Sequence, residues 1–258
     1  MAVLVTGASS GIGYACAVRL AAAGREVLVH GRTPERAERA AGSVRGEVDG
    51  ARVVPVHADL SSLAAVRALA RTVGRLDGLV NNAGLFAGND VEHERRVSAD
   101  GHELHWAVNY LAPFVLTGLV DAPVVVNVVS GMRASLRWDD PGLVEGWDRV
   151  VAYGQSKLAL TMFSVELAAR APHRSVFAVN PGYVDTRLVR ESFGGAVNSA
   201  DSGARWVAAP LLPGFTGTSG GFLDAGEWSA PPPLAADPGA RARLWELTGT
   251  QLDSTVPG

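Results

Sequence analysis

The beginning of the chain constrains its fold more than any other stretch. Residues 2–5 read Ala-Val-Leu-Val, and residues 6–13 read Thr-Gly-Ala-Ser-Ser-Gly-Ile-Gly. A short apolar run that glycines stop at once is typical of a buried parallel strand entering a tight turn. Small and apolar residues then recur at helical spacing from Ile12 to Ala23. The stretch therefore predicts a strand, a glycine turn and a helix whose free N–H groups can face phosphates.

The three glycines of this turn each have a physical use. Gly7 allows the sharp turn, Gly11 lets the backbone approach a diphosphate, and Gly13 lets the helix pack against the strand. Glycine turns between a strand and a helix also occur in α/β folds that bind no nucleotide. Nucleotide binding is the favoured interpretation of this stretch, and motifs elsewhere in the chain are needed to support it.

Strands and helices are expected to alternate along the remaining chain. Apolar runs bounded by turn residues predict further strands at 26–31, 52–57, 76–80, 124–129, 175–179 and 220–223. Helical spacing and capping residues predict helices after 33, after 61 or 62, and at 99–119, 153–170 and 240–248. With right-handed crossovers, this order gives an α/β fold with a doubly wound parallel sheet of about seven strands and helices on both faces. Residues 1–258 are expected to form one domain, with a variable lid at about 185–215 and a C-terminal tail at about 229–258.

Composition disfavours several classes of function. The formal net charge is -3 and no basic run occurs, which makes nucleic acid an unexpected partner. Cys16 is the single cysteine, so no disulfide can form within the chain, and the six histidines show no spacing suited to a metal. No apolar stretch reaches about 18 residues, and no signal peptide precedes the first strand. We therefore expect a cytoplasmic protein with no membrane anchor and no metal.

One pair of side chains carries a specific chemistry. Tyr153 and Lys157 are four residues apart at the start of a predicted helix, so they share one face. A tyrosine with an ordinary pKa of about 10 is a poor base, but a nearby ammonium favours the phenolate and lowers that pKa. Ser130, at the end of the neighbouring strand, can hold the same substrate oxygen. A surface Tyr–Lys pair has the same spacing, so the pair alone leaves catalysis open.

Further motifs occur in an order and at a spacing that match one family over nearly the whole chain. The chain resembles the classical short-chain dehydrogenases/reductases through its glycine turn, Asn81-Asn82-Ala83-Gly84, Asn109, Ser130, Tyr153-Gly154-Gln155-Ser156-Lys157 and Asn180-Pro181-Gly182-Tyr183-Val184-Asp185-Thr186. The resemblance implies a Rossmann-type fold and a catalytic set of Asn109, Ser130, Tyr153 and Lys157. Tyr153 would be the acid/base, and Ser130 would orient the carbonyl or hydroxyl. Lys157 would lower the pKa of the tyrosine and bind the nicotinamide ribose, and Asn109 would hold a water molecule that relays protons.

The resemblance also implies a nicotinamide cofactor along the carboxyl ends of the strands. Its expected contacts are Gly7, Ser9, Ser10, Gly11, Ile12, Gly13, Arg32, Asp59, Leu60, Asn82, Ala83, Gly84, Tyr153, Lys157, Pro181, Gly182, Val184 and Thr186. Asp59 would contact the adenine, although its carboxylate could equally cap the next helix. NAD enzymes of the family place an acidic residue after the second strand, but here Gly31 is followed by Arg32. Because a guanidinium suits a 2′-phosphate, we predict NADP(H) as the cofactor.

A narrower resemblance is to the retinol dehydrogenase-like branch of the family. It rests on Asp100-Gly101-His102-Glu103-Leu104, Val108-Asn109-Tyr110-Leu111, Ser156-Lys157-Leu158-Ala159 and Leu244-Trp245-Glu246. The link Val120–Pro123 is shorter than in relatives, where the end of the preceding helix often helps to form a dimer interface. The chain is compatible with a homo-oligomer, but its oligomeric state stays open.

These patterns predict an NADP(H)-dependent oxidoreductase that interconverts a ketone or aldehyde and an alcohol by hydride transfer and Ser-Tyr-Lys acid/base catalysis. Five aromatic residues in or near loops could wall an apolar pocket, which favours an apolar small molecule as substrate: Trp138, Trp147, Phe193, Trp206 and Phe215. Two alternative functions are compatible with the same fold. A biosynthetic tailoring enzyme could carry out epimerisation or imine reduction, and a non-catalytic NADP-binding regulator could bind the cofactor without turnover. The regulator is disfavoured because Ser130, Tyr153 and Lys157 are all present.

Overall fold

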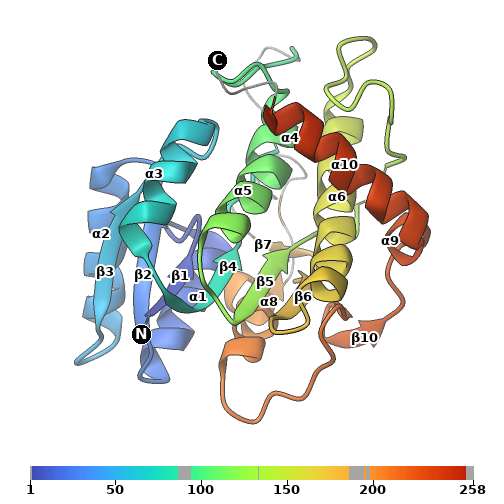
Figure 1. Ribbon diagram of the computed structural model, residues 1–258. Coiled ribbons are helices and arrows are strands. Elements are labelled where there is room, and N and C mark those ends of the chain that lie inside the picture. Colours follow the sequence, from blue (N-terminus) through green and yellow to red (C-terminus); the bar gives the residue numbers. More distant parts are fainter. Residues whose placement is uncertain (1, 87–93, 133, 186–194, 196–197, 254–258) are drawn as a thin grey trace.

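The computed structural model describes residues 2–86, 94–132, 134–185, 195 and 198–253. Its main sheet has eight strands in the order β10-β9-β6-β5-β4-β1-β2-β3 (Figure 1). These strands are β1 (Ala2–Val5), β2 (Glu26–Gly31), β3 (Val53–His57), β4 (Leu76–Asn81), β5 (Val124–Val128), β6 (Ser175–Asn180), β9 (Phe222–Asp224) and β10 (Glu227–Ser229). All neighbouring strands are parallel except β10, which is antiparallel to β9. The doubly wound α/β fold predicted from the sequence is confirmed.

Helices cover both faces of this sheet and bury two separate hydrophobic clusters. One face carries α1 (Gly11–Ala22), α2 (Pro34–Glu47) and α8 (Ala200–Ala208). The other carries α3 (Leu63–Val73), α5 (Ala112–Leu119), α6 (Arg149–Arg170), α9 (Pro233–Ala236) and α10 (Pro238–Asp253). Figure 1 shows α3, α5 and α6 side by side on this second face, with α10 crossing α6. The buried strands are rich in valine and leucine, as expected of a parallel sheet covered on both sides.

The eighth strand is the one that the sequence pattern did not predict. β10 has three residues, all exposed, and it follows a tight turn in which Ala225 has a φ of 49° and Gly226 a φ of 99°. A strand this short shows no alternation of polar and apolar residues over enough positions to be recognised. The sheet therefore gains an antiparallel edge strand, which a β-hairpin can add without a crossover helix.

Two predicted helices differ from the structure at their N-termini. The helix expected at 99–119 begins at α4 (Leu104–Trp106), because Gly101 has a φ of 85° and Glu103 accepts a hydrogen bond from the Trp106 amide as the cap. It continues through a π-helical turn, η1 (Ala107–Leu111), into α5. The helix expected at 153–170 begins four residues earlier, where the carboxylate of Asp148 accepts from the Val151 amide at 2.9 Å. Both differences come from caps that side chains form outside the apolar pattern.

The segment expected to be a lid at 185–215 is part of the core in its second half. Ala204, Val207 and Ala208 on α8 are fully buried, and η2 (Ala209–Leu211) follows directly. α8 packs along α1, and Arg19 on α1 makes a two-pronged ion pair with Asp201 on α8. Residues 186–194 and 196–197 of the predicted lid lie outside the described residues. The two-residue strands β7 (Val184–Asp185) and β8 (Asn198–Ser199), which precede and follow these residues in the sequence, form a separate parallel pair.

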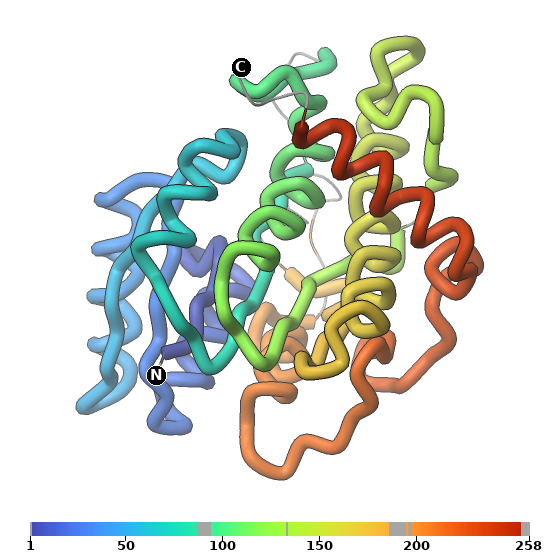
Figure 2. Tube along the Cα trace, viewed as in Figure 1, coloured from blue at the N-terminus to red at the C-terminus, as the bar shows by residue number. Residues whose placement is uncertain are grey.

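The C-terminal segment from about 229 is more regular than the predicted tail. α10 has sixteen residues and lies across α6, as the tube in Figure 2 also shows. The hydroxyl groups of Tyr110 on η1 and Thr248 on α10 hydrogen-bond at 2.5 Å, and both side chains are fully buried. This helix therefore belongs to the hydrophobic core of the second face.

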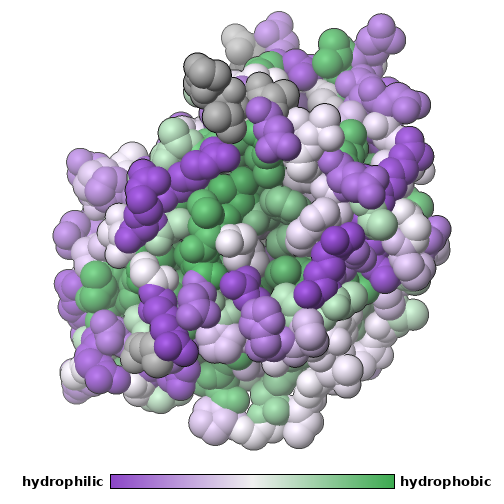
Figure 3. All heavy atoms as spheres, viewed as in Figure 1, coloured by the Kyte–Doolittle hydropathy of each residue, from purple (hydrophilic) through white to green (hydrophobic). Residues whose placement is uncertain are grey.

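The short link between α5 and β5 is held by one arginine. The guanidinium of Arg174 donates to the carbonyl of Thr117 at 2.9 Å and to that of Val120 at 3.0 Å. Carbonyls in the last turn of a helix have no partner within the helix, so Arg174 satisfies groups that the abrupt ending of α5 exposes. Next to this link, Leu119 is about half exposed, and Figure 3 shows an apolar area over α5 between more polar margins.

Candidate active site

The glycine turn between β1 and α1 is shaped to receive a phosphate group. Gly7 has a φ of 64°, and a Cβ atom there would lie 2.7 Å from the Cα of Ala83. A Cβ atom on Gly13 would overlap the side chain of Asn82 and the carbonyl of Gly7. Ser10, the N-cap of α1, makes no side-chain capping bond, and the first turn holds no acidic residue. The α1 N-terminus thus keeps the positive end of its dipole and its first amides for an anion, which fits the diphosphate of a dinucleotide.

The loop after β4 is locked to this turn. Asn82 donates from Nδ2 to the carbonyl of Thr6 at 2.8 Å, and the hydroxyl of Thr6 accepts from the amides of Asn82 and Ala83 at 3.0 Å each. These hydrogen bonds hold the glycine turn of residues 6–13 against the Asn81–Gly84 loop, although the two motifs are far apart in sequence. They also identify Thr6 as a residue that orients the predicted cofactor site.

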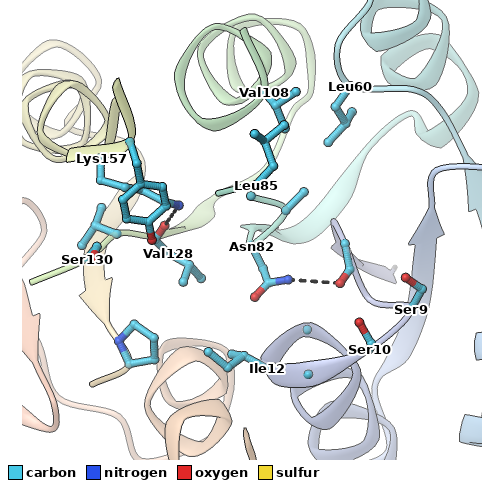
Figure 4. Close-up of a pocket in the computed structure, with 18 of the residues that line it drawn as sticks. Ser9, Ser10, Ile12, Leu60, Asn82, Leu85, Val108, Val128, Ser130 and Lys157 are labelled. Carbon is cyan, nitrogen blue, oxygen red and sulfur yellow. Dashed lines mark hydrogen bonds between the residues drawn. The ribbon is translucent and has the colours of Figure 1, made fainter. Parts of the chain in front are cut away.

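A cleft of about 750 Å³ runs along the carboxyl ends of the strands. Figure 4 places Ser9 and Ser10 towards one end and Ser130 and Lys157 towards the other. Every residue predicted to contact the cofactor lines this cleft, except Thr186, which lies outside the described residues. The residues brought together are Gly7, Ser9, Ser10, Gly11, Ile12, Gly13, Arg32, Asp59, Leu60, Asn82, Ala83, Gly84, Tyr153, Lys157, Pro181, Gly182 and Val184, with Ser130 beside them.

Ser130, Tyr153 and Lys157 meet at one end of the cleft. Lys157 is 4% exposed and donates from Nζ to the carbonyl of Val128 at 2.8 Å. Its burial lowers the pKa of the ammonium to about 8. Burial raises the pKa of Tyr153, and a hydrogen bond with Ser130 works in the opposite direction. The tyrosine side chain is therefore a protonated hydroxyl that hydrogen-bonds Ser130, and Lys157 follows it by one turn of α6.

Asn109 lies behind the wall of the cleft rather than in it. It is fully buried on η1, where its Oδ1 accepts from the Leu85 amide at 2.9 Å and its Nδ2 donates to the Leu85 carbonyl at 3.0 Å. The same Nδ2 contacts the hydroxyl of Ser156 at 3.1 Å. The side chain thus fixes the loop after β4 to the helix that carries Tyr153. The predicted water relay through Asn109 stays a prediction.

The opposite end of the cleft holds the residues that bear on cofactor choice. Arg32 donates from Nε to Asp59 Oδ2 at 3.0 Å, and its side chain is 67% exposed. Asp59 Oδ1 accepts from the amide and hydroxyl of Ser61, whereas Ser62 caps α3. Partial burial alone would raise the pKa of Asp59, but the bonds from Ser61 and the charge of Arg32 hold it below its usual value. Asp59 therefore positions Arg32 and does not cap the helix.

The lining of the cleft also includes residues that the sequence did not predict as site residues, among them His30, Arg36, Leu85 and Met132. Arg36 lies in the first turn of α2, four residues after Arg32, which precedes the helix. The spacing of the two arginines in the sequence could have indicated that both face the same end of the cleft. His30 lies inside β2, where its apolar neighbours made it resemble a core residue. Leu85 follows the Asn81–Gly84 motif directly, and Met132 lies two residues after Ser130.

The prediction that five aromatic side chains wall the substrate pocket is wrong for the four that the structure describes. Trp138, Trp147, Trp206 and Phe215 do not line the cleft. Trp147 donates from Nε1 to the buried carboxylate of Glu103 at 3.2 Å, and Phe215 packs edge-on against Phe177 in the core. The fifth, Phe193, lies outside the described residues. Large aromatic side chains in loops pack wherever apolar surface is available, which sequence position alone does not reveal.

The described part of the chain contains neither a cluster of metal ligands nor a helix suited to crossing a membrane. Within residues 2–86, 94–132, 134–185 and 198–253, no three His, Cys, Asp or Glu side chains are grouped as metal ligands would be. None of the described helices combines the length and the apolar character that crossing a bilayer requires.

Comparison with known proteins agrees with this geometry. Residues 1–195 match the family model for short chain dehydrogenases. Retinol dehydrogenase 13 of Mus musculus is 34% identical over 294 residues, which cover 99% of this chain and 86% of that protein. Polyprenol dehydrogenase of Homo sapiens is 28% identical, with 98% of this chain and 86% of that protein covered.

Solved structures share the fold. A crystal structure of an uncharacterized protein from Mycobacterium paratuberculosis has a TM-score of 0.82 at 28% identity, covering 98% of this chain and 93% of that one. The landomycin C-6 ketoreductase LanV, crystallised with bound NADP and rabelomycin, has a TM-score of 0.65 at 29% identity, covering 87% and 94%. Family match, relatives and site agree: the chain belongs to the short-chain dehydrogenases, and within them to the retinol dehydrogenase-like branch.

Proposed function

We propose that this protein is an NADP(H)-dependent oxidoreductase that interconverts a ketone or aldehyde and an alcohol. One observation carries the proposal: a single cleft joins the uncapped α1 N-terminus and Arg32 at one end to Ser130, Tyr153 and Lys157 at the other. A dinucleotide lying along the cleft would bring its nicotinamide to the three catalytic candidates. Retinol and polyprenol dehydrogenases among the relatives support an alcohol or carbonyl substrate.

The side chains have distinct roles in this proposal. When bound, the nicotinamide would supply or accept the hydride. Tyr153 donates its hydroxyl proton to the substrate oxygen in the reductive direction and takes it back in the oxidative direction. Ser130 hydrogen-bonds the same oxygen and the tyrosine hydroxyl. The ammonium of Lys157 stabilises the negative charge that develops on the tyrosine oxygen.

The preference for NADP(H) rests on the end of β2. A Cβ atom on Gly31 would lie 2.5 Å from the amide nitrogen of Ala37, so α2 approaches too closely for an acidic side chain at this position. Arg32 and Arg36 both line the cleft at this end, and two guanidinium groups suit the charge of a 2′-phosphate. LanV, crystallised with bound NADP, supports the same choice.

An apolar substrate is proposed from the side chains beside the reacting end. Leu85, Met132 and Val184 line the cleft together with Tyr183, whose side chain is about half exposed. Such a wall binds a molecule by its hydrocarbon surface and leaves orientation to the few polar groups. Relatives that act on retinol and polyprenol, and LanV with bound rabelomycin, are consistent with a hydrophobic carbonyl or alcohol.

The test is NADPH oxidation, followed by absorbance, with a panel of apolar ketones, aldehydes and retinoid-like or aromatic carbonyls. Tyr153→Phe should lower kcat by about 10²–10⁴-fold, because only the proton-donating hydroxyl is removed. Its dissociation constant for NADPH should stay unchanged. Tyr110→Phe is the matched control, since that buried hydroxyl bonds Thr248 and neither residue lines the cleft. Turnover that survives Tyr153→Phe contradicts the proposal, and silence across the whole panel favours epimerisation or imine reduction instead.

A further inference from the structure

His30 is a buried titratable group in direct contact with the glycine turn, and the proposed chemistry does not use it. It lies on β2, is 2% exposed and contributes to the wall of the cleft. Its Nδ1 accepts a hydrogen bond from the amide of Gly7 at 3.1 Å. Its Nε2 lies 3.1 Å from the carbonyl of Ala58, just after β3. An amide can only donate and a carbonyl can only accept, so the imidazole is neutral and carries its proton on Nε2.

The main chain strengthens the same connection. The carbonyl of His30 accepts from the Ala8 amide at 2.9 Å, and the next carbonyl, that of Gly31, accepts from the Ala58 amide at 3.2 Å. One residue of β2 thus contacts both the glycine turn after β1 and the loop after β3. These loops carry Ser9 and Asp59, which both line the cleft.

We propose that His30 is a positioning residue for the cofactor, which orients the glycine turn through the Gly7 amide and joins it to the loop that holds Asp59. The inference rests on the proposed function, because it assumes that a dinucleotide binds in this cleft. Gly7 has a left-handed backbone conformation, with a φ of 64°. Because glycine can adopt several other backbone conformations, a hydrogen-bond acceptor for its amide helps to select this one. The nitrogen Nδ1 of His30 supplies that acceptor from a rigid ring inside the sheet.

Two substitutions separate the two hydrogen bonds of the ring. In His30→Asn, the side-chain oxygen can take the place of Nδ1 and accept from Gly7. In His30→Gln, the terminal amide can take the place of Nε2 and donate to Ala58, but the Gly7 amide loses its acceptor. His57→Asn is the matched control, because His57 is exposed on the adjacent strand β3.

The experiment measures the dissociation constant of NADPH by its fluorescence, together with amide hydrogen exchange at Gly7 in the free protein. We expect His30→Gln to weaken NADPH binding about tenfold and to speed Gly7 exchange, as for an unsatisfied buried donor. His30→Asn and His57→Asn should stay within about twofold of the wild type. The KM for NADPH should rise in His30→Gln while kcat and the KM for the carbonyl stay constant.

The outcomes distinguish this inference from the function on which it rests. If the wild type bound neither NADPH nor NADH, the proposed function would fail, and the inference with it. If the wild type bound NADPH and the Asn and Gln variants were equal in affinity and in Gly7 exchange, only the inference would fail. A fall in melting temperature shared by both variants, without a difference in affinity, would likewise assign His30 a purely structural role.

Discussion

Lys157 donates a hydrogen bond of 2.8 Å to the main-chain carbonyl of Val128, the last residue of β5 (Figure 4). The contact ties the helix that carries Tyr153 to the strand that leads to Ser130. Because the ammonium is buried, its desolvation lowers the pKa to about 8. The protein thus keeps an ionisable amine buried at a cost in stability, which the proposed role of Lys157 in catalysis accounts for.

Lys157→Met is expected to abolish turnover and to stabilise the fold at pH 7. The folded-state pKa of Lys157 lies below its ordinary value of 10.5, so its contribution to stability is present above pH 10.5 and is lost as the pH falls through about 8. Removing the buried charge should raise the free energy of unfolding by about 1–2 kcal/mol, after the lost bond to Val128 is subtracted. Urea unfolding at pH 7 measures this, and a destabilised variant would contradict it.

The rate of carbonyl reduction should decline as the pH rises through about 8. Below that pKa Lys157 is protonated and stabilises the tyrosine oxygen after proton donation, and above it the charge is lost. The decline should appear in kcat/KM for NADPH, which reports the free enzyme. A profile that stays level from about pH 6.5 to 9.5 would show that this ammonium does not control the reaction.

Cofactor preference should respond differently to two neighbouring substitutions. Arg32→Asp should shift the ratio of kcat/KM from NADPH towards NADH by about tenfold or more, because it exchanges a phosphate-binding cation for a ribose-binding carboxylate. Gly31→Asp should instead lower the melting temperature without such a shift, since its Cβ would press on the Ala37 amide. Lower KM values for NADH than for NADPH in the wild type would contradict the preference itself.

Acid stability should depend on His30. Burial lowers its pKa to about 4, so the stability that its neutral form provides is present above pH 6.5 and is lost as the pH falls through about 4. Its charged neighbours act in opposite directions: His57 lowers this pKa and Asp59 raises it. The loss should reach at most about 3 kcal/mol, and it should be absent in His30→Asn. Urea unfolding of both proteins between pH 7 and 4 isolates this difference from the titration of carboxylates, and parallel curves would contradict it.

Arg174→Leu should destabilise the protein by about 1–3 kcal/mol, because the carbonyls of Thr117 and Val120 lose their donor. Arg71→Leu, on the exposed face of α3, is the control and should change the free energy of unfolding by less than about 0.5 kcal/mol. Since neither arginine lines the cleft, kcat at 25 °C should remain that of the wild type in both variants. An Arg174 variant as stable as the control would contradict the role of this residue in the short link.

Local patterns account for what could be predicted from the chain. The glycine turn, the Asn82–Gly84 loop and the Tyr153–Lys157 pair each lie within a few consecutive residues, and parallel strands must present their carboxyl ends at one edge. The sequence therefore sufficed for the family, for seven of the eight strands of the main sheet and for most of the residues that line the cleft. It also indicated the NADP(H) preference through Arg32, which stays a prediction.

Tertiary structure alone decided the contacts between residues distant in sequence. His30 meets Gly7 across 23 positions, and Arg174 reaches Thr117 across 57. Ala37 leaves no room at Gly31, α8 fills a place expected for a lid, and Trp147 turns to Glu103 instead of the cleft. Periodicity and short motifs report which face of an element is buried, but not which distant group lies against it. That choice follows from how the helices close over the sheet, where packing density and the satisfaction of buried polar groups decide each contact.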